Sequence, residues 1–283
     1  MGRELKSLRE AASATREEVA ERLGCDLTKI SRIELGRSGV RKVELETMLD
    51  MYGVTDRAKR TALLAISRTS RTKGWWHQYD DLLRPSSRDL FDMEADADTI
   101  FSFEMSLVPG LLQTEEYARA LIAGGGVCTS SEETTEALVK LRMERQSLFN
   151  QVTPPRLIAL IDEAALRRPV GGPSVMARQL RHLNEITSPP SLAIHVLPLN
   201  LGVHPGIDGP FHLISYAPDA GFDVALLDHR YSGIWLEEEE QVNAYRTLFD
   251  HIRSMALSSP QSRSLIDRLA QEFDESADGR KQP

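Results

Sequence analysis

Residues 15–35 read TREEVAERLGCDLTKISRIEL, and this stretch decides the fold of the N-terminal part of the chain. Thr15 and Glu18 have the spacing of a capping box, which marks the start of a helix. Gly24 is expected to end that helix, because glycine adopts a left-handed backbone at little steric cost. Asp26 is suited to capping a following helix. We therefore predict two short helices joined by a tight turn.

The apolar residues of this stretch have the spacing of a helix-turn-helix. Ala20 leaves room for the close approach of a second helix, whose buried face would be Ile30 and Ile33. In a helix-turn-helix the second helix enters the major groove of DNA. A helical hairpin with a glycine in its turn is the alternative. Amphipathic patterns over residues 5–12 and 43–52 place the pair in a larger helical bundle, which favours the helix-turn-helix.

The order of these helices resembles the Cro/CI-type, or XRE, family of lambda-repressor-like domains. The run SRIELGR at residues 31–37 is close to the end of the recognition helix in that family. The resemblance implies that an arginine late in the first helix, here Arg9, pairs with a glutamate near the end of the recognition helix, here Glu34. We expect this pair to be structural and assign neither side chain to base readout.

The side chains expected to contact double-stranded DNA lie in the recognition helix and beside it. Lysine and arginine can bond guanine edges or phosphates, and threonine can bond a base or touch a thymine methyl. The candidates in the helix are Leu27, Thr28, Lys29 and Arg32. Leu27 departs from the polar residue common there. The flanking candidates, expected to contact phosphates, are Arg16, Arg37, Arg41 and Lys42. An exposed arginine without such a role is the alternative for Arg16.

Charge is divided unevenly along the chain. The 283 residues carry a net charge of −8. Residues 1–75 hold 16 Lys/Arg and 11 Asp/Glu, a net of +5, so the remainder is at −13. A basic N-terminal module on an acidic body is the asymmetry expected when only the first part meets phosphates.

Composition favours a cytoplasmic globular protein. Hydrophobic residues make up 41% and charged residues 27% of the chain. No apolar run approaches the length of a membrane span, and the N-terminus lacks the apolar core of a signal peptide. The cysteines, Cys25 and Cys128, make neither a disulfide framework nor a zinc site, and we expect no metal or cofactor.

We predict an all-α, lambda-repressor-like bundle followed by an α+β domain with a mixed sheet flanked by helices. The expected parts are a DNA-binding domain over 1–72, an aromatic and acidic connector over 73–98, a C-terminal domain over 99–275 and a disordered tail over 276–283.

The C-terminal pattern predicts strands and helices in mixed order. Thr114 and Ser130 are the expected caps of two of the helices. Strands are expected at 99–108, 156–161, 191–199, 211–217, 223–228 and 234–236. Helices are expected at 114–122, 130–149, 173–187, 238–257 and 260–273.

Several longer motifs resemble a family of actinobacterial XRE-type regulators whose C-terminal domain is described as antitoxin-like. In chain order they are Trp75-Trp76, VPGLLQTEEYARAL at 108–121, LRMERQ at 141–146, DEAALRRPVGG at 162–172, HVLPL at 195–199 and HPGIDGPF at 204–211. The resemblance implies a transcription regulator, often encoded beside a small partner protein. It supplies no biochemical role for the C-terminal domain.

The sequence gives little sign of an enzyme. It contains no GxSxG, Walker A, HExxH or kinase-like motif. His195, within an apolar strand, is expected to be a core histidine. His204 and Asp208 in the HPGID loop are expected to scaffold a turn, a binding loop being the alternative. The acidic and basic pairs at 162–163 and 167–168 are expected to form a salt-bridge network.

These observations predict a homodimeric, sequence-specific regulator whose C-terminal domain senses an effector or binds a partner. Dimerisation is inferred because one small helix-turn-helix buries little DNA surface, whereas two about 34 Å apart match an inverted repeat. The alternative is an antitoxin-like protein that sequesters a small partner and regulates its own operon.

Overall fold

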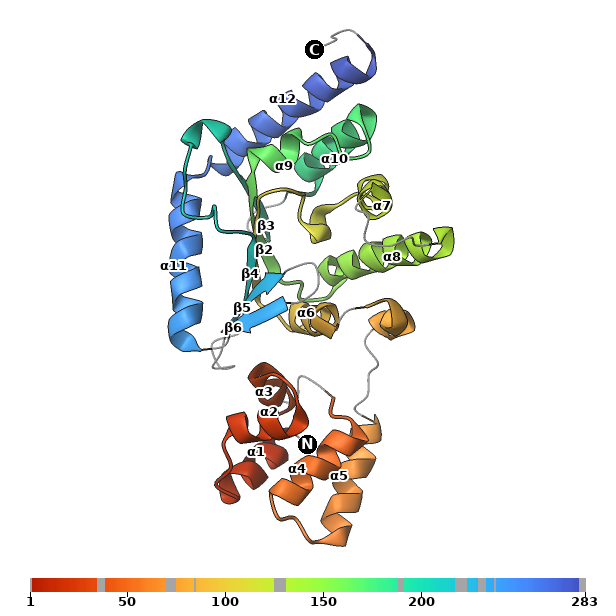
Figure 1. The fold of residues 1–283 in the computed structure, drawn as a ribbon, viewed down its shortest axis with the longest axis vertical. Coiled ribbons are helices and arrows are strands. Elements are labelled where there is room, and N and C mark those ends of the chain that lie inside the picture. The colour runs from red at the N-terminus through yellow and green to blue at the C-terminus, as the bar shows by residue number, and fades with distance from the viewer. Residues whose placement is uncertain are drawn as a thin grey trace. The chain divides into compact units, whose positions relative to one another are not determined.

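The chain divides into two compact units, residues 1–78 and 79–283, each described by itself. The structure is a computed structural model, drawn in Figure 1. It describes residues 2–34, 39–69, 75–83, 85–124, 131–187, 191–216, 223–228, 233–236 and 238–279. Arg37, one of the predicted phosphate contacts, lies outside these residues.

The N-terminal unit is a bundle of helices around one apolar core. Its helices are α1 (Gly2–Ala11), α2 (Arg16–Leu23), α3 (Leu27–Glu34), α4 (Lys42–Met51) and α5 (Arg57–Thr69). Leu5, Val19, Ile30, Ile33 and Leu45 are fully buried and bring four of these helices together. The predicted all-α bundle is confirmed.

One residue of the predicted core faces outward. The apolar pattern over 43–52 includes Val43, which is 72% exposed, whereas Val40 just before α4 is buried. Val43 precedes Leu45 by two residues, which puts it on roughly the opposite side of the helix from the apolar face. Leu45, Met48 and Leu49 form that face.

A mixed sheet of six strands organises the C-terminal unit, in the order β3-β2-β1-β4-β5-β6. The strands are β1 (Thr99–Glu104), β2 (Arg156–Asp162), β3 (Leu192–Leu197), β4 (Phe211–Ser215), β5 (Asp223–Asp228) and β6 (Gly233–Leu236). The first three are parallel, and β4, β5 and β6 each pair antiparallel with the strand before them in the sheet. The predicted mixed sheet is confirmed.

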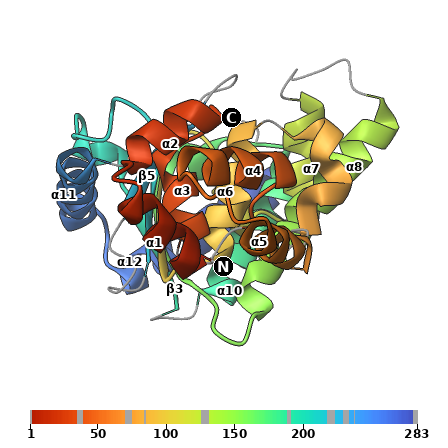
Figure 2. The ribbon, with the colours of Figure 1, turned by 90° about the horizontal axis from the view of Figure 1, so that it is seen from below.

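Helices cover both faces of this sheet, as Figures 1 and 2 show. One face packs against α7, α10 and α12, in a core that includes Ile100, Tyr117 and Leu180. The other packs against α11 through Phe103, Phe211 and Phe249. The bounds are α7 (Glu115–Gly124), α8 (Glu132–Arg145), α9 (Glu163–Arg167), α10 (Pro173–Ile186), α11 (Glu239–Met255) and α12 (Ser259–Ala277).

The segment predicted as an irregular connector contains two helical elements, η1 (Trp75–Leu82) and α6 (Pro85–Ala95). Pro85 is the first residue of α6, a position that proline favours because its missing N–H and fixed φ suit a helix start. The remaining 3-10 turns are η2 (Gly110–Leu112), η3 (Gln146–Asn150) and η4 (Leu199–Leu201).

The predicted ends of several elements differ from the observed ones: the strand expected over 99–108 ends at Glu104, and the helix expected over 130–149 is α8 followed by η3. The cap of α8 is Ser131, whose hydroxyl accepts a hydrogen bond from the Thr134 amide at 3.2 Å, so the prediction of Ser130 was wrong by one residue. The expected disordered tail begins inside α12, which runs to Ala277. The Thr114 cap is confirmed, since its hydroxyl accepts from the Tyr117 amide at 3.3 Å.

Candidate nucleic-acid interface

The turn between α2 and α3 has the predicted geometry. The Glu18 amide donates to the Thr15 hydroxyl at 3.2 Å, and the Thr15 amide donates to the Glu18 carboxylate at 2.8 Å, which completes the capping box. Gly24 lies in the left-handed region, with φ of 62° and ψ of 42°. The Cys25 amide donates to the Ala20 carbonyl at 3.0 Å, so the chain reverses tightly into α3. This is the local geometry of a helix-turn-helix.

The end of α3 is tied to the helices before it by a buried glutamate. Arg9 donates to Glu34 through two nitrogens, with Nε 2.5 Å from Oε1 and Nη2 3.1 Å from Oε2. Arg16 Nε adds a third bond to Glu34 Oε2 at 3.2 Å. The Glu34 side chain is 1% exposed and that of Arg9 10%. The predicted structural pair is confirmed, and the structure adds Arg16 to it.

The role predicted for Arg16 was a phosphate contact. In this structure its guanidinium pairs with Glu34 and its side chain remains 38% exposed. An arginine bonded through Nε alone keeps donors on its other two nitrogens. The phosphate contact therefore stays a prediction, compatible with the observed pair.

Lys29 and Arg41 converge on Glu44, near the start of α4. Lys29 Nζ lies 2.8 Å from Glu44 Oε1, and Arg41 Nε lies 2.6 Å from the same oxygen. The Arg41 amide also donates to Glu44 Oε2 at 3.0 Å. Burial alone would raise the pKa of the Glu44 carboxyl, but the hydrogen bonds from Arg41 and Lys29 outweigh it and hold that pKa below its ordinary value. Glu44 therefore stays charged.

Sequence reasoning did not single out Glu44. The available signal was its place three residues after Arg41 at a helix start, where a glutamate caps the backbone. Its contact with Lys29 joins α4 to α3 between residues that are fifteen positions apart, and no local sequence pattern predicts such a contact. Glu44 fixes the position of one predicted DNA contact and one predicted phosphate contact at once.

The remaining candidates differ in exposure. Lys42 is 58% exposed beside Glu46, and Arg41 is 68% exposed, so both can reach a phosphate. Leu27 is half-buried. Thr28 and Arg32 are 2% and 4% exposed in this structure.

Six of the eight residues of α3 are buried, although the helix period assigns only Ile30 and Ile33 to the core. Among the described residues, the Thr28 hydroxyl has no hydrogen-bond partner. The assignment of Thr28 and Arg32 to DNA contact stays a prediction.

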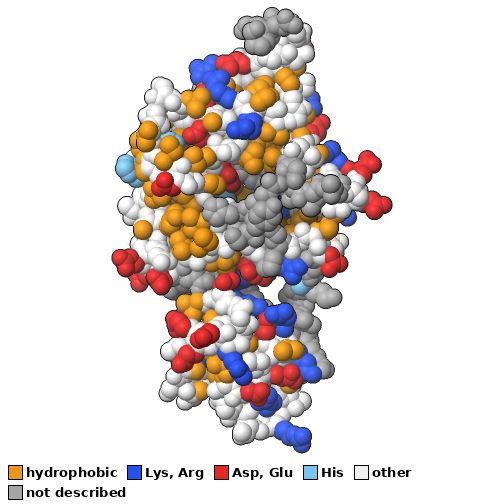
Figure 3. Space-filling view, viewed as in Figure 1, with side chains coloured by type: hydrophobic (Ala, Val, Ile, Leu, Met, Phe, Trp, Pro, Cys, Tyr) orange, Lys and Arg blue, Asp and Glu red, His pale blue; other side chains and the backbone are white. Residues whose placement is uncertain are grey.

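Charges of both signs are interspersed on the N-terminal unit. Figure 3 shows Lys and Arg side chains among Asp and Glu on the face in view. Lys59 pairs with Glu4 at 2.7 Å, and Arg60 with Asp50 at 2.7 Å. Many of the basic groups thus have acidic neighbours within the unit, and a DNA phosphate must compete with them.

The HPGID loop of the C-terminal unit is built as a scaffold. His204 is 8% exposed, and its Nδ1 accepts from the Gly206 amide at 3.2 Å. Its Nε2 faces Asp162 Oδ2 at 3.4 Å. A Cβ on Gly206 would lie 2.5 Å from the Phe103 ring, so only glycine fits there without a shift. These contacts favour the predicted turn scaffold for His204.

Other predicted core groups also have structural partners. His195 Nδ1 lies 3.1 Å from the Leu257 carbonyl. Asp162 caps α9 through the Ala164 amide at 2.7 Å. Arg167 bonds Glu163 at 2.7 Å, which is one pair of the predicted salt-bridge network, and it also bonds Glu272 at 3.3 Å, which was not predicted.

A further titratable group that sequence reasoning missed lies on the sheet, where Glu104 faces His212. Glu104 Oε1 lies 3.7 Å from His212 Nε2, beyond hydrogen-bond distance. Burial, aided by Asp228, raises the pKa of Glu104 to about 7. Burial, aided by Arg145, lowers the pKa of His212 to about 4. Among the described residues, no group of three His, Cys, Asp or Glu side chains is placed to hold a metal ion.

Comparisons with known proteins agree with this division of the chain. A family described as "Helix-turn-helix domain" matches residues 1–63, which include α1 to α4. A family described as "Domain of unknown function (DUF5753)" matches residues 87–268. Searches of curated proteins and of solved structures found no match. Within the described residues, no helix is long and apolar enough to cross a membrane. The chain belongs to the DUF5753 family and carries an N-terminal helix-turn-helix domain.

Proposed function

We propose that this protein is a sequence-specific transcription regulator of the XRE type, which binds double-stranded DNA through α2 and α3 as a homodimer. The observation that carries the proposal is the α2–α3 turn, with Gly24 in the left-handed region and Glu34 bonded to Arg9 and Arg16. This arrangement fixes the angle at which α3 can enter a major groove. The resemblance to actinobacterial regulators supports the same conclusion.

Lys29 is the recognition-helix side chain best placed to contact DNA. It is 26% exposed, and its partner Glu44 also bonds Arg41. A partly exposed ion pair contributes about 1 kcal/mol or less. A phosphate or a guanine edge can therefore displace Glu44 from Lys29, while Arg41 keeps the carboxylate paired. Arg41 and Lys42 then contact the backbone of the duplex.

Dimerisation follows from the size of the DNA-binding unit. A single small module buries too little surface for an operator affinity in the nanomolar range. Two modules related by a two-fold axis would occupy half-sites about one helical turn apart. In this proposal the C-terminal unit holds the two copies together.

The C-terminal unit acts in this proposal as a regulatory domain without catalytic activity. The two loop residues considered for chemistry, His204 and Asp208, belong to a turn whose His204 is engaged with Gly206 and Asp162. The Asp162–Glu163 pair is used to cap α9 and to bind Arg167. Purified protein that turned over a substrate, and lost that activity on His204→Asn or Asp208→Asn, would contradict this assignment.

Genome-wide occupancy of the tagged protein tests the proposal. We expect a small set of reproducible sites that share an inverted repeat, and the loss of most of them in the Lys29→Ala variant. No reproducible site would contradict it. Coexpression with a neighbouring short reading frame distinguishes the antitoxin-like alternative: a stable complex that abolishes a toxic activity of the partner would favour sequestration as the main role.

A further inference from the structure

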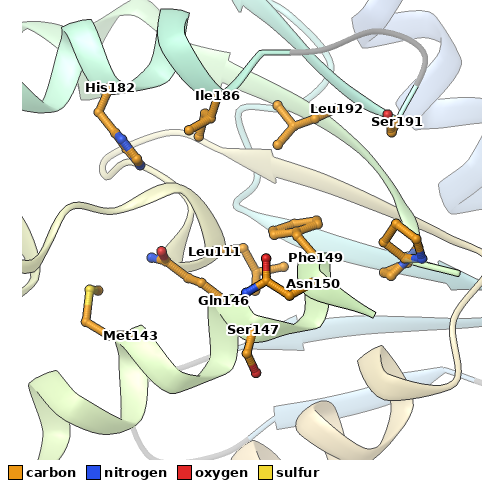
Figure 4. A pocket seen from close by; sticks show the side chains of 12 residues that line it. Leu111, Met143, Gln146, Ser147, Phe149, Asn150, His182, Ile186, Ser191 and Leu192 are labelled. Carbon is orange, nitrogen blue, oxygen red and sulfur yellow. The ribbon is translucent and has the colours of Figure 1, made fainter. Parts of the chain in front are cut away.

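A cavity of about 570 Å³ opens in the C-terminal unit. It lies between the end of α8 with η3, the C-terminal half of α10 and the start of β3, as Figure 4 shows. This volume is in the range of small-molecule sites in proteins, which are concave and mostly apolar. The apolar lining is Leu111, Met143, Phe149, Pro154, Pro155, Ile186 and Leu192.

Among the described residues that line the cavity, the polar side chains are uncharged. They are Gln146, Ser147, Asn150, His182 and Ser191. Burial lowers the pKa of His182, against the opposing effect of Glu185, so its imidazole is neutral at physiological pH. A site with no charged side chain in its lining offers nothing to offset the desolvation of a charged ligand. The cavity therefore selects against ions.

Hydrogen-bonding groups approach the cavity from two sides. Figure 4 shows His182 reaching in from α10, and Gln146 and Asn150 from η3 opposite. Gln146 Nε2 donates to the Gln113 carbonyl at 2.6 Å, which fixes the orientation of this amide. The ring of Phe149 lies between Asn150 and Leu192. The arrangement suits a ligand with a flat apolar body and a hydrogen-bonding group at its edge.

The cavity wall is joined directly to α6. Arg145, the residue before Gln146, bonds the Glu94 carboxylate through Nε at 2.7 Å and Nη2 at 2.5 Å. Both side chains are largely buried, at 14% and 3% exposed, and Arg145 also lies 5.0 Å above the centre of the Phe91 ring. A ligand that shifts η3 therefore moves Arg145 against α6, the first long helix after the segment that leads from the DNA-binding unit.

We propose that this cavity is the effector site of the protein, and that it binds an uncharged, aromatic small molecule carrying one or two hydrogen-bonding groups. The effector role rests on the proposed regulatory function. The binding site itself rests only on the residues that line the cavity.

Two matched dyes test the ligand class. N-phenyl-1-naphthylamine is neutral, and 1-anilinonaphthalene-8-sulfonate is the same ring system with a sulfonate. Titration of the full chain with each dye is followed by its fluorescence. We expect the neutral dye to bind at least tenfold more tightly. Equal binding of the two dyes, tighter binding of the sulfonate, or no binding of either would overturn the proposal.

A filled cavity tests the location. Asn150→Trp places a large ring in the cavity from an exposed position at the end of η3, and Gln151→Trp places the same ring on the next, exposed residue, outside the lining. We expect Asn150→Trp to weaken binding of the neutral dye at least tenfold and Gln151→Trp to leave it within twofold. Equal effects of the two variants would show that the dye binds elsewhere and would overturn the assignment.

The effector role is measured separately, as operator affinity with and without saturating neutral dye. A change of at least threefold in the wild type, absent in Asn150→Trp, supports the role. Dye binding in the cavity with unchanged operator affinity overturns the effector role and leaves both the site and the proposed function standing. Dye binding without any operator binding would overturn the proposed function alone.

Discussion

Arg9 and Glu34 form a buried, two-bond ion pair that fastens α1 to the last turn of α3. Their hydrogen bonds raise the pKa of the Arg9 guanidinium above its ordinary value, although burial opposes this. The two residues are twenty-five positions apart in the sequence: Arg9 precedes the helix-turn-helix and Glu34 is its last residue. The orientation of α3 therefore depends on a glutamate that is not itself available to DNA.

Replacing Glu34 with alanine is expected to destabilise the N-terminal unit by about 3–5 kcal/mol, because it leaves the Arg9 charge buried without its partner. Chemical denaturation followed by far-UV circular dichroism measures the change. Glu10→Ala is the control, since Glu10 is 57% exposed and lies 3.8 Å from Arg9. A Glu34→Ala protein as stable as the control, with an altered base preference, would mean that Glu34 reads DNA.

Replacing Lys29 with alanine is expected to lower operator affinity by about 1–3 kcal/mol, the usual effect of losing a base contact. The variant should unfold at nearly the wild-type denaturant concentration, because a partly exposed ion pair contributes little to stability. Lys140→Ala, on an exposed side chain of α8, removes the same charge from the other unit and should leave affinity unchanged. If both Lys29→Ala and Arg32→Ala bound the operator like the wild type, the assignment of α3 to recognition would be wrong.

The Glu104–His212 pair predicts opposing effects of pH on stability. The pKa of Glu104 is about 7 in the folded protein against an ordinary 4.5, so its contribution to the free energy of unfolding falls as pH rises from 4.5 to 7. The pKa of His212 is about 4 against an ordinary 6.5, so its contribution rises from pH 4 to 6.5. The two contributions largely cancel in the wild type.

Single variants should separate these two contributions. Relative to the wild type, Glu104→Gln should gain stability with rising pH between 4.5 and 6.5, and His212→Asn should lose it, each by on the order of 3 kcal/mol. Urea denaturation of the three proteins at pH 4.5, 5.5 and 6.5 gives the slopes. Slopes of the same sign in both variants would show that burial does not shift the pKa values of Glu104 and His212 in opposite directions.

The close packing of Gly206 makes a strong prediction for the scaffold loop. A Cβ there would lie 2.5 Å from Phe103 Cε1 and 2.9 Å from Ile252 Cδ1, so Gly206→Ala forces apart β1 and α11. We expect a loss of about 1–3 kcal/mol in the C-terminal unit, typical of overpacking a core. Gly124→Ala is the control, because a Cβ there meets nothing within 4 Å and alanine favours a helix. Equal thermal stability of the two variants would show that the loop accommodates a Cβ at position 206 at little cost, and would contradict the prediction.

Local signals in the sequence predicted most elements of this fold. The Thr15–Glu18 box, Gly24 and Thr114 each mark a helix end by chemistry that needs only neighbouring residues. The apolar run in β2 likewise predicts a strand buried on both faces. The first part of α6 was not predicted, because its initial proline is also typical of a turn.

Contacts between distant segments could not be predicted in this way. The bond of Lys29 to Glu44 depends on how α3 packs against α4, which the local pattern of neither helix predicts. The residues that line the cavity come from separate segments between Leu111 and Leu192, so no single stretch of sequence predicts it. Residue type suggested which side chains can contact DNA. The groups that these side chains bond within the protein could be identified only from the structure.

The most direct test of the central claim is a footprint of the purified full chain on its most occupied genomic site, measured over a range of salt concentrations. We expect two protected half-sites about one helical turn apart, and an affinity that falls steeply as salt rises because phosphate contacts release counterions. Absence of protection at low salt, or uniform protection of any duplex, would contradict sequence-specific binding through α3.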